Sequence, residues 1–114
     1  MPSEYALILT TYPREEAARA AARELVERRL APAAQVFPIG SVYRWKGAIR
    51  HESEYMLLIT AKAAMYAAIE EFISTHHTYE TPELLRLPVA GGLPDYLRWI
   101  DRESGNTAVP PPAP

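Results

Sequence analysis

Residues 76–88 read His-His-Thr-Tyr-Glu-Thr-Pro-Glu-Leu-Leu-Arg-Leu-Pro, and the rest of the chain is organised around them. An apolar pattern at helical spacing leads into this stretch, and a short apolar strand pattern leads out of it. Between the two lie two imidazoles, a phenol and two carboxylates. The stretch therefore marks a helix-to-strand connection and carries the chain's densest set of groups able to bind a charge.

Outward from this stretch, the hydrophobic pattern predicts four strands and three helices. Continuous or alternating apolar runs predict strands at 4–11, 33–45, 48–60 and 83–89. Apolar stripes at helical spacing predict helices at 13–30, 61–77 and 93–103. Lys46-Gly47 predicts a tight turn that joins the second and third strands into a hairpin. Pro38 cannot donate to a strand ladder and Gly40 weakens one, so we expect a bend or bulge near them.

The order of these elements predicts the fold class. A β-α-β-β-α-β order followed by a terminal helix indicates an α+β, ferredoxin-like sandwich with an extended β-hairpin and a C-terminal helix. We expect residues 1–103 to form this one domain. Residues 104–114 end in Val-Pro-Pro-Pro-Ala-Pro and have no core-forming pattern, so we expect a disordered Pro-rich tail.

The predicted sheet would be covered on one side only. Both long helices would pack on one face, leaving the short third helix to cover the other. Tyr43 and Trp45 alternate along the hairpin and therefore share a face. Exposed aromatic side chains on a polar β-arm are typical of a subunit interface, so we expect a homo-oligomer with Tyr43 and Trp45 at its interface.

Composition narrows the class of protein. The chain has 114 residues, a formal net charge of −2 and no cysteine. This charge argues against a nucleic-acid partner, because phosphate binding needs a basic face. No apolar run approaches the roughly 20 residues that span a bilayer, and the first residues do not have the pattern of a signal peptide. We expect a cytoplasmic protein without disulfides and without a membrane partner.

Five motifs in chain order carry a resemblance to a known family. They are Thr10-Thr11-Tyr12-Pro13, Leu25-Val26-Glu27-Arg28-Arg29-Leu30-Ala31, Ser41-Val42-Tyr43-Arg44-Trp45-Lys46-Gly47, His77-Thr78-Tyr79-Glu80-Thr81-Pro82-Glu83 and Tyr96-Leu97-Arg98-Trp99-Ile100. Over residues 4–101 the chain resembles the CutA family of divalent-cation tolerance proteins. The resemblance implies a ferredoxin-like protomer in a tight homotrimer, similar in build to the PII signalling proteins. It also implies binding of a divalent metal ion, with copper most often named.

The resemblance further implies a set of metal ligands. In bacterial members these are a cysteine that closes the first strand and the histidines that end the second helix. His76 and His77 match those histidines, whereas Thr10 stands at the cysteine position and is a poor copper ligand. Glu80 or a group from a neighbouring subunit would complete the site. The alternative is that the histidines only stabilise the C-terminus of the helix through its dipole.

Other polar residues in or near residues 76–88 also have two interpretations. Tyr79 and Glu83 could form a ligand pocket with Lys62 or Arg86, or a hydrogen-bonded turn fixed by Pro82. No nucleophile or oxyanion hole accompanies the carboxylates, so we expect no enzyme and no organic cofactor.

The competing function is a PII-like signalling module that binds a small anionic ligand or a partner protein at subunit clefts. The residues that would matter there are Arg44, Lys46, Arg50 and Lys62.

Overall fold

A computed structural model describes residues 3–105, and the predicted tail beyond Gly105 lies outside the described residues. The strands are β1 (Tyr5–Tyr12), β2 (Ala33–Trp45), β3 (Ala48–Lys62) and β4 (Leu84–Pro88). The helices are α1 (Glu15–Glu27), α2 (Tyr66–His76) and α3 (Pro94–Glu103), with a short 3-10 turn, η1 (Ala63–Met65), before α2. No helix within this range is long and apolar enough to cross a membrane.

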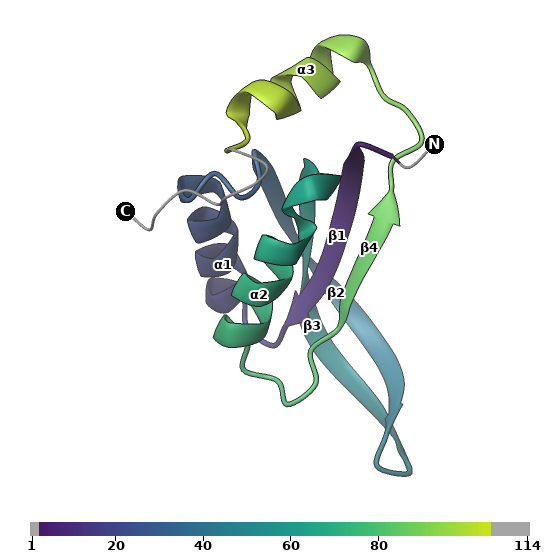
Figure 1. Cartoon of the computed structure of the whole chain (residues 1–114). Coiled ribbons are helices and arrows are strands. Elements are labelled where there is room, and N and C mark those ends of the chain that lie inside the picture. The colour runs from purple at the N-terminus through teal and green to yellow at the C-terminus, as the bar shows by residue number, and fades with distance from the viewer. Residues whose placement is uncertain (1–2, 106–114) are drawn as a thin grey trace.

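The four strands form one antiparallel sheet in the order β2-β3-β1-β4. Helices α1 and α2 lie side by side over one face of it, and α3 lies across one end (Figure 1). This arrangement confirms the predicted ferredoxin-like α+β fold with an extended hairpin and a terminal helix. Beyond the end of β1, β2 and β3 continue as a two-stranded arm (Figure 1).

The core lies between the sheet and the two long helices. Alternate residues of the central strands point into it, and Ile8, Leu57 and Ile59 are fully buried there. Ala18 and Ala21 let α1 approach the sheet closely, while Ile69 and Ile73 supply the apolar side of α2. Burial of these side chains is the main stabilising term for the domain.

Two turns fix how the elements connect. Lys46 and Gly47 form the two-residue hairpin loop with φ values of 49° and 80°, which is the type I′ geometry that matches strand twist. Helix α1 ends at Glu27 and is capped by Arg28, and the chain then turns at Arg29, which has a φ of 60°. The Arg29 and Leu30 amides donate to the Val26 and Leu25 carbonyls. This is a Schellman motif, which normally has glycine at the left-handed position.

Two local details differ from the prediction. The pairing of β2 with β3 is unbroken through Pro38 and Gly40, so of the expected bend or bulge the bulge is absent. Strand β2 lies at the sheet edge, where a proline removes no bond from an interior ladder. The second helix starts at Tyr66 rather than at Ala61, because β3 continues to Lys62 and pairs there with Tyr5.

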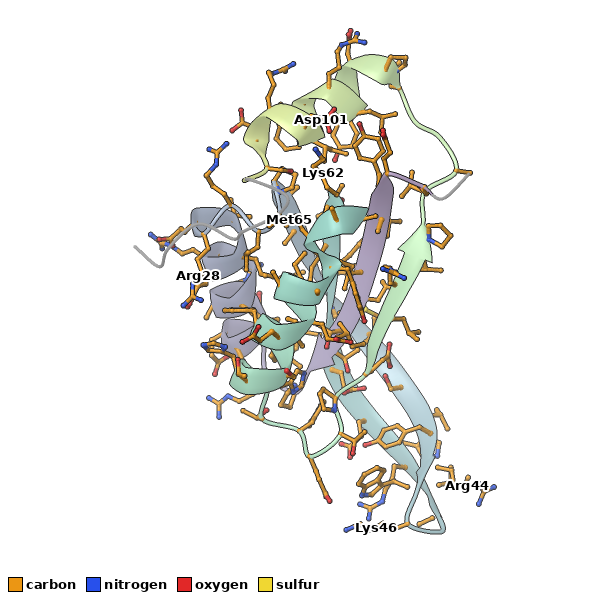
Figure 2. The ribbon with its side chains drawn as sticks, in the orientation of Figure 1. Arg28, Arg44, Lys46, Lys62, Met65 and Asp101 are labelled. Carbon is orange, nitrogen blue, oxygen red and sulfur yellow. The ribbon has the colours of Figure 1, made fainter. Side chains whose placement is uncertain are left out.

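The sheet face opposite the long helices is only covered at one end. There Asp101 of α3 accepts a hydrogen bond from the Tyr5 hydroxyl at 3.0 Å and pairs with the Lys62 ammonium at 3.4 Å (Figure 2). We call the rest the open sheet face, and strand alternation assigns it Leu7, Leu9, Phe37, Met56, Leu58, Leu85 and Leu87. Leu85 is 57% exposed and Leu87 44%.

Candidate functional site

His77 is the centre of the connection between α2 and β4. Its Nε2 lies 2.6 Å from the Thr11 carbonyl oxygen, and its Nδ1 accepts the Tyr79 amide at 3.1 Å. The ring stacks on Tyr12 at 4.3 Å between centroids, with Tyr79 tilted against it at 4.9 Å. Because a carbonyl can only accept, Nε2 carries the proton and donates, and both ring nitrogens are occupied.

Burial lowers the pKa of His77 below its usual value, although the Thr11 carbonyl and the Glu54 carboxylate act in the opposite direction. The neutral ring is therefore the form that this environment favours. A metal ion would need a free nitrogen lone pair, and His77 has none while these two hydrogen bonds hold. The role that the geometry gives His77 is to tie the connection to the end of β1.

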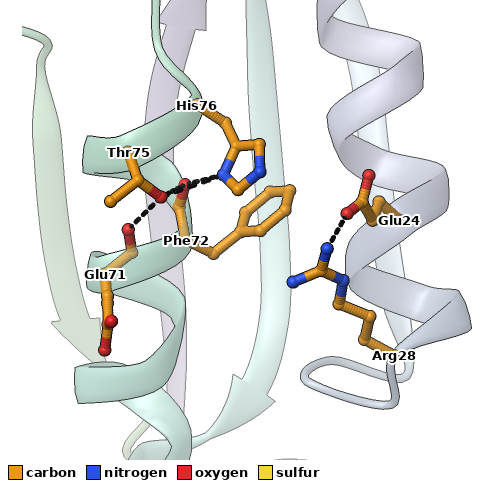
Figure 3. Close-up of polar contacts among 6 residues, drawn as sticks. All are labelled: Glu24, Arg28, Glu71, Phe72, Thr75 and His76. Carbon is orange, nitrogen blue, oxygen red and sulfur yellow. Dashed lines mark hydrogen bonds and ion pairs between the residues drawn. The ribbon is translucent and has the colours of Figure 1, made fainter. Parts of the chain in front are cut away.

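His76 has different surroundings although it is the adjacent residue. It ends α2, its ring stacks on Phe72 at 4.4 Å, and its Nδ1 lies 2.8 Å from the Phe72 carbonyl oxygen (Figure 3). Nδ1 must therefore donate, which leaves the lone pair on Nε2. Within residues 3–105 no group bonds Nε2. Metal-ligating histidines typically donate their second nitrogen to a carbonyl or carboxylate, as His76 does.

A cavity of about 430 Å³ lies between the hairpin arm and the connection. We call it the hairpin cavity, and its walls carry Tyr43, Trp45, Glu54, Tyr79, Glu80 and Glu83 together with Thr11, Thr78 and Thr81. Tyr79 donates its hydroxyl to Glu54 at 2.6 Å, and Glu54 is only 7% exposed. Burial, followed by this carboxylate, raises the pKa of Tyr79. Three carboxylates and three aromatic rings give the cavity an acidic, aromatic lining.

The structure brings some of the predicted site residues together and separates others. Tyr79, Glu80 and Glu83 line the hairpin cavity, and Tyr43 and Trp45 form its opposite wall.

Lys62 and Arg86 do not join them. Lys62 pairs opposite Tyr5 at the far end of β3, and the Arg86 guanidinium lies over the Tyr66 ring on the helical side of the sheet. The antiparallel course of β3 is the reason that Lys62 is distant from the connection.

The predicted metal ligands are separated too. His76 faces the helical side, Glu80 lines the hairpin cavity, and Thr10 is buried beneath the helices. Among residues 3–105 there is no group of three or more His, Cys, Asp or Glu side chains placed to hold one ion.

Two residues that shape the hairpin cavity are absent from the sequence-based site. Glu54 lies in a polar run of β3 that resembles solvated surface, and Thr11 resembles an ordinary strand end. The signal that identifies both is the strand register, which pairs Thr11 with Met56 and sets Glu54 two residues further along the same face. That register follows from the fold rather than from a local motif.

The fold and the cavity together describe a ferredoxin-like α+β domain with an uncovered apolar sheet face and a cavity under its hairpin arm. The chain belongs to the CutA family, since the family described as CutA1 divalent ion tolerance protein matches residues 6–103. It is 36% identical over 100 residues to the divalent-cation tolerance protein CutA of Thermus thermophilus, covering 87% of this chain and 97% of that protein. The resemblance inferred from the five motifs is confirmed.

Two further relatives agree with this assignment. The chain is 35% identical over 116 residues to Protein CutA of Mus musculus, covering 96% of this chain and 66% of the mouse protein. It thus spans about two thirds of the mouse protein's length. The crystal structure of the stable protein CutA1 from the psychrotrophic bacterium Shewanella sp. SIB1 matches with a TM-score of 0.89 and 36% identity. That match covers 93% of this chain and all of the Shewanella chain.

Proposed function

We propose that the chain forms a non-enzymatic, cytoplasmic homotrimer that acts in divalent-cation tolerance. In this proposal it binds a divalent metal ion through His76, and copper is the first candidate for that ion. The family's description and the Thermus relative's name support the link to divalent cations. The observation that most supports the residue is the free Nε2 of His76, whose Nδ1 is held by the Phe72 carbonyl. Imidazole nitrogen suits Cu(II) well.

The donor set limits the kind of site. His77 has both nitrogens bonded, and the hydroxyl of Thr10 is buried and is a poor copper ligand. One protomer therefore offers one available imidazole at the end of α2. The remaining ligands in this proposal are water or groups of a neighbouring copy, which gives an open, weakly selective site.

The trimer in this proposal rests on the open sheet face. Its seven apolar side chains lie together, and monomeric proteins rarely expose a contiguous apolar patch of this kind. Covering the face with a second and third copy would remove it from water without covering the helices or His76.

Copper titration tests the metal proposal. We expect Cu(II) to bind the wild-type chain, His76→Gln to lose that binding, and His51→Gln to retain it. His51 is the matched control because it is an exposed histidine on β3, away from α2. Equal affinity in the wild type and in His76→Gln would remove His76 from the site.

A PII-like signalling module is the second candidate. It is favoured by the cations near the tip of the hairpin arm, where Arg44, Lys46 and Arg50 accompany Tyr43 (Figure 2). An anionic ligand or partner protein at a subunit cleft would meet these side chains. A thermal shift with nucleotides and none with Cu(II) would favour this function over metal binding.

A further inference from the structure

A second cavity lies between α1 and α2, on the opposite side of the sheet from the open sheet face. We call it the helix cavity, and its volume is about 290 Å³. Its lining consists of Arg28, Leu30, Ala68, Glu71, Phe72, Thr75 and His76. The volume is near the lower limit of about 300 Å³ for ligand sites, so only a small ligand would fit.

Arg28 supplies the positive charge of the helix cavity. It caps the C-terminus of α1, directly before the Schellman turn at Arg29. The Arg28 amide donates to the Glu24 carbonyl and the Arg29 amide to the Val26 carbonyl, so the backbone at this position is fixed. Its Nη2 pairs with Glu24, and its Cζ lies 5.4 Å from the centroid of the Phe72 ring (Figure 3). The Arg28 Nε is buried without a hydrogen-bond partner in the described part of the chain. One carboxylate therefore does not saturate this guanidinium, which has five donors.

The rest of the lining is mostly apolar or neutral. Phe72 forms the centre of the wall between Arg28 and His76, and Leu30 and Ala68 extend it. Figure 3 shows the Glu71 side chain directed away from Arg28. The Thr75 hydroxyl bonds backbone carbonyls of its own helix, at 2.9 Å to Glu71 and 3.2 Å to Phe72.

We propose that the helix cavity binds a small organic monocarboxylate, whose carboxylate pairs with Arg28 and whose apolar body packs on Phe72, Leu30 and Ala68. A guanidinium recognises a carboxylate through charge-assisted hydrogen bonds. A monoanion is favoured over a phosphate because Glu24 already pairs with Arg28, so a dianion would face stronger repulsion. The proposed carboxylate site borders the proposed metal contact, since His76 lines the helix cavity, but carboxylate binding depends on Arg28 and not on the lone pair of His76.

Benzoate is the probe for this proposal, with benzamide and benzylamine as neutral and cationic controls of similar shape. We expect benzoate added to the metal-free chain in a chelator to shift amide NMR signals of the helix cavity, at Arg28, Phe72 and Thr75. Benzamide should bind more weakly, and benzylamine should not bind. Working without metal separates this result from the copper titration, so either proposal can fail alone.

Two variants and a control assign the contact. Arg28→Gln should weaken benzoate binding about tenfold or more, as expected for losing a hydrogen bond to a charged group. Arg23→Gln is the control, because Arg23 forms a similar pair with Glu27 on the same helix but is exposed and lines neither cavity. Ala68→Leu keeps the charge but fills the helix cavity, so it should also abolish binding, and it provides a test if Arg28→Gln does not fold.

The proposal is overturned by any of three results. These are no benzoate shift in the wild-type chain at tens of millimolar, shifts confined to the hairpin cavity, or unchanged affinity in a folded Arg28→Gln or Ala68→Leu variant.

Discussion

Replacing His77 with phenylalanine separates the hydrogen bonds of this side chain from its stacking. Phenylalanine keeps a ring against Tyr12 and Tyr79 but removes the bonds to the Thr11 carbonyl and the Tyr79 amide. Each buried group left without its partner costs about 1–3 kcal/mol, and this site is only half-buried. We therefore expect His77→Phe to lower the free energy of unfolding by about 2–4 kcal/mol near neutral pH.

The same substitution should remove a pH dependence. Since burial lowers the pKa of His77 in the folded chain, the unfolded chain binds more protons between that pKa and the ordinary value of 6.5. The His77 contribution is therefore complete above 6.5 and is lost as the pH falls from there through the folded pKa. The slope for one group reaches at most about 1.4 kcal/mol per pH unit. His77→Phe should lack this component.

Urea unfolding at a fixed protomer concentration, at several values between about pH 5 and pH 8, measures both effects. His51→Gln is the control, because it removes an exposed imidazole. It should leave unchanged both the free energy of unfolding near neutral pH and the part of its pH dependence that His77 causes. A His77→Phe variant that is as stable as the wild type near neutral pH, or that keeps the same dependence of stability on pH, would show that these hydrogen bonds do not stabilise the fold.

Three further substitutions test separate parts of the structure. Thr10→Val should raise the free energy of unfolding by about 1 kcal/mol, because the buried Thr10 hydroxyl has no hydrogen-bond partner among residues 3–105. Thr10→Ser keeps the hydroxyl and should therefore give no gain in stability. A Thr10→Val variant less stable than the wild type would contradict this expectation. Gly47→Ala should lower the free energy of unfolding by about 1–2 kcal/mol, because alanine is strained at a positive φ of 80°. The strain lies in the backbone alone, since the added Cβ meets no atom within 4 Å. An unchanged melting temperature would count against this backbone conformation. Tyr79→Phe leaves the buried Glu54 carboxylate without its hydrogen-bond donor, so it should lower the free energy of unfolding, measured in urea, by about 1.5–3 kcal/mol. A variant as stable as the wild type would show that water replaces the Tyr79 hydroxyl.

Local sequence patterns predict most of the fold. The continuous or alternating apolar runs of β1 to β3 and the Lys46-Gly47 turn are local signals, and both strands of the hairpin begin and join as predicted. Two local signals mislead. Pro38 indicates a bulge only if its strand is interior, and the position of β2 at the sheet edge is a property of the whole fold. The alanines after Ile59 favour a helix, but pairing with β1 extends β3 to Lys62.

The sequence predicts the candidate site less well than the fold, because the contacts of the site join residues that are far apart in the chain. Helical geometry does predict that adjacent His76 and His77 diverge. It does not predict that His77 would bond Thr11, 66 residues earlier, or that Tyr79 would reach Glu54, 25 residues earlier. These bonds depend on the register of β1 with β3. Arg28 is likewise unremarkable in sequence, and only the packing of α1 beside α2 places it against Phe72.

Sedimentation equilibrium at micromolar concentration shows whether identical copies cover the open sheet face. We expect a species of three times the 12.8 kDa protomer mass, and smaller species when Leu85→Glu places a charge on that face. A stable, folded single chain of wild-type sequence at this concentration would mean that no second copy covers the face.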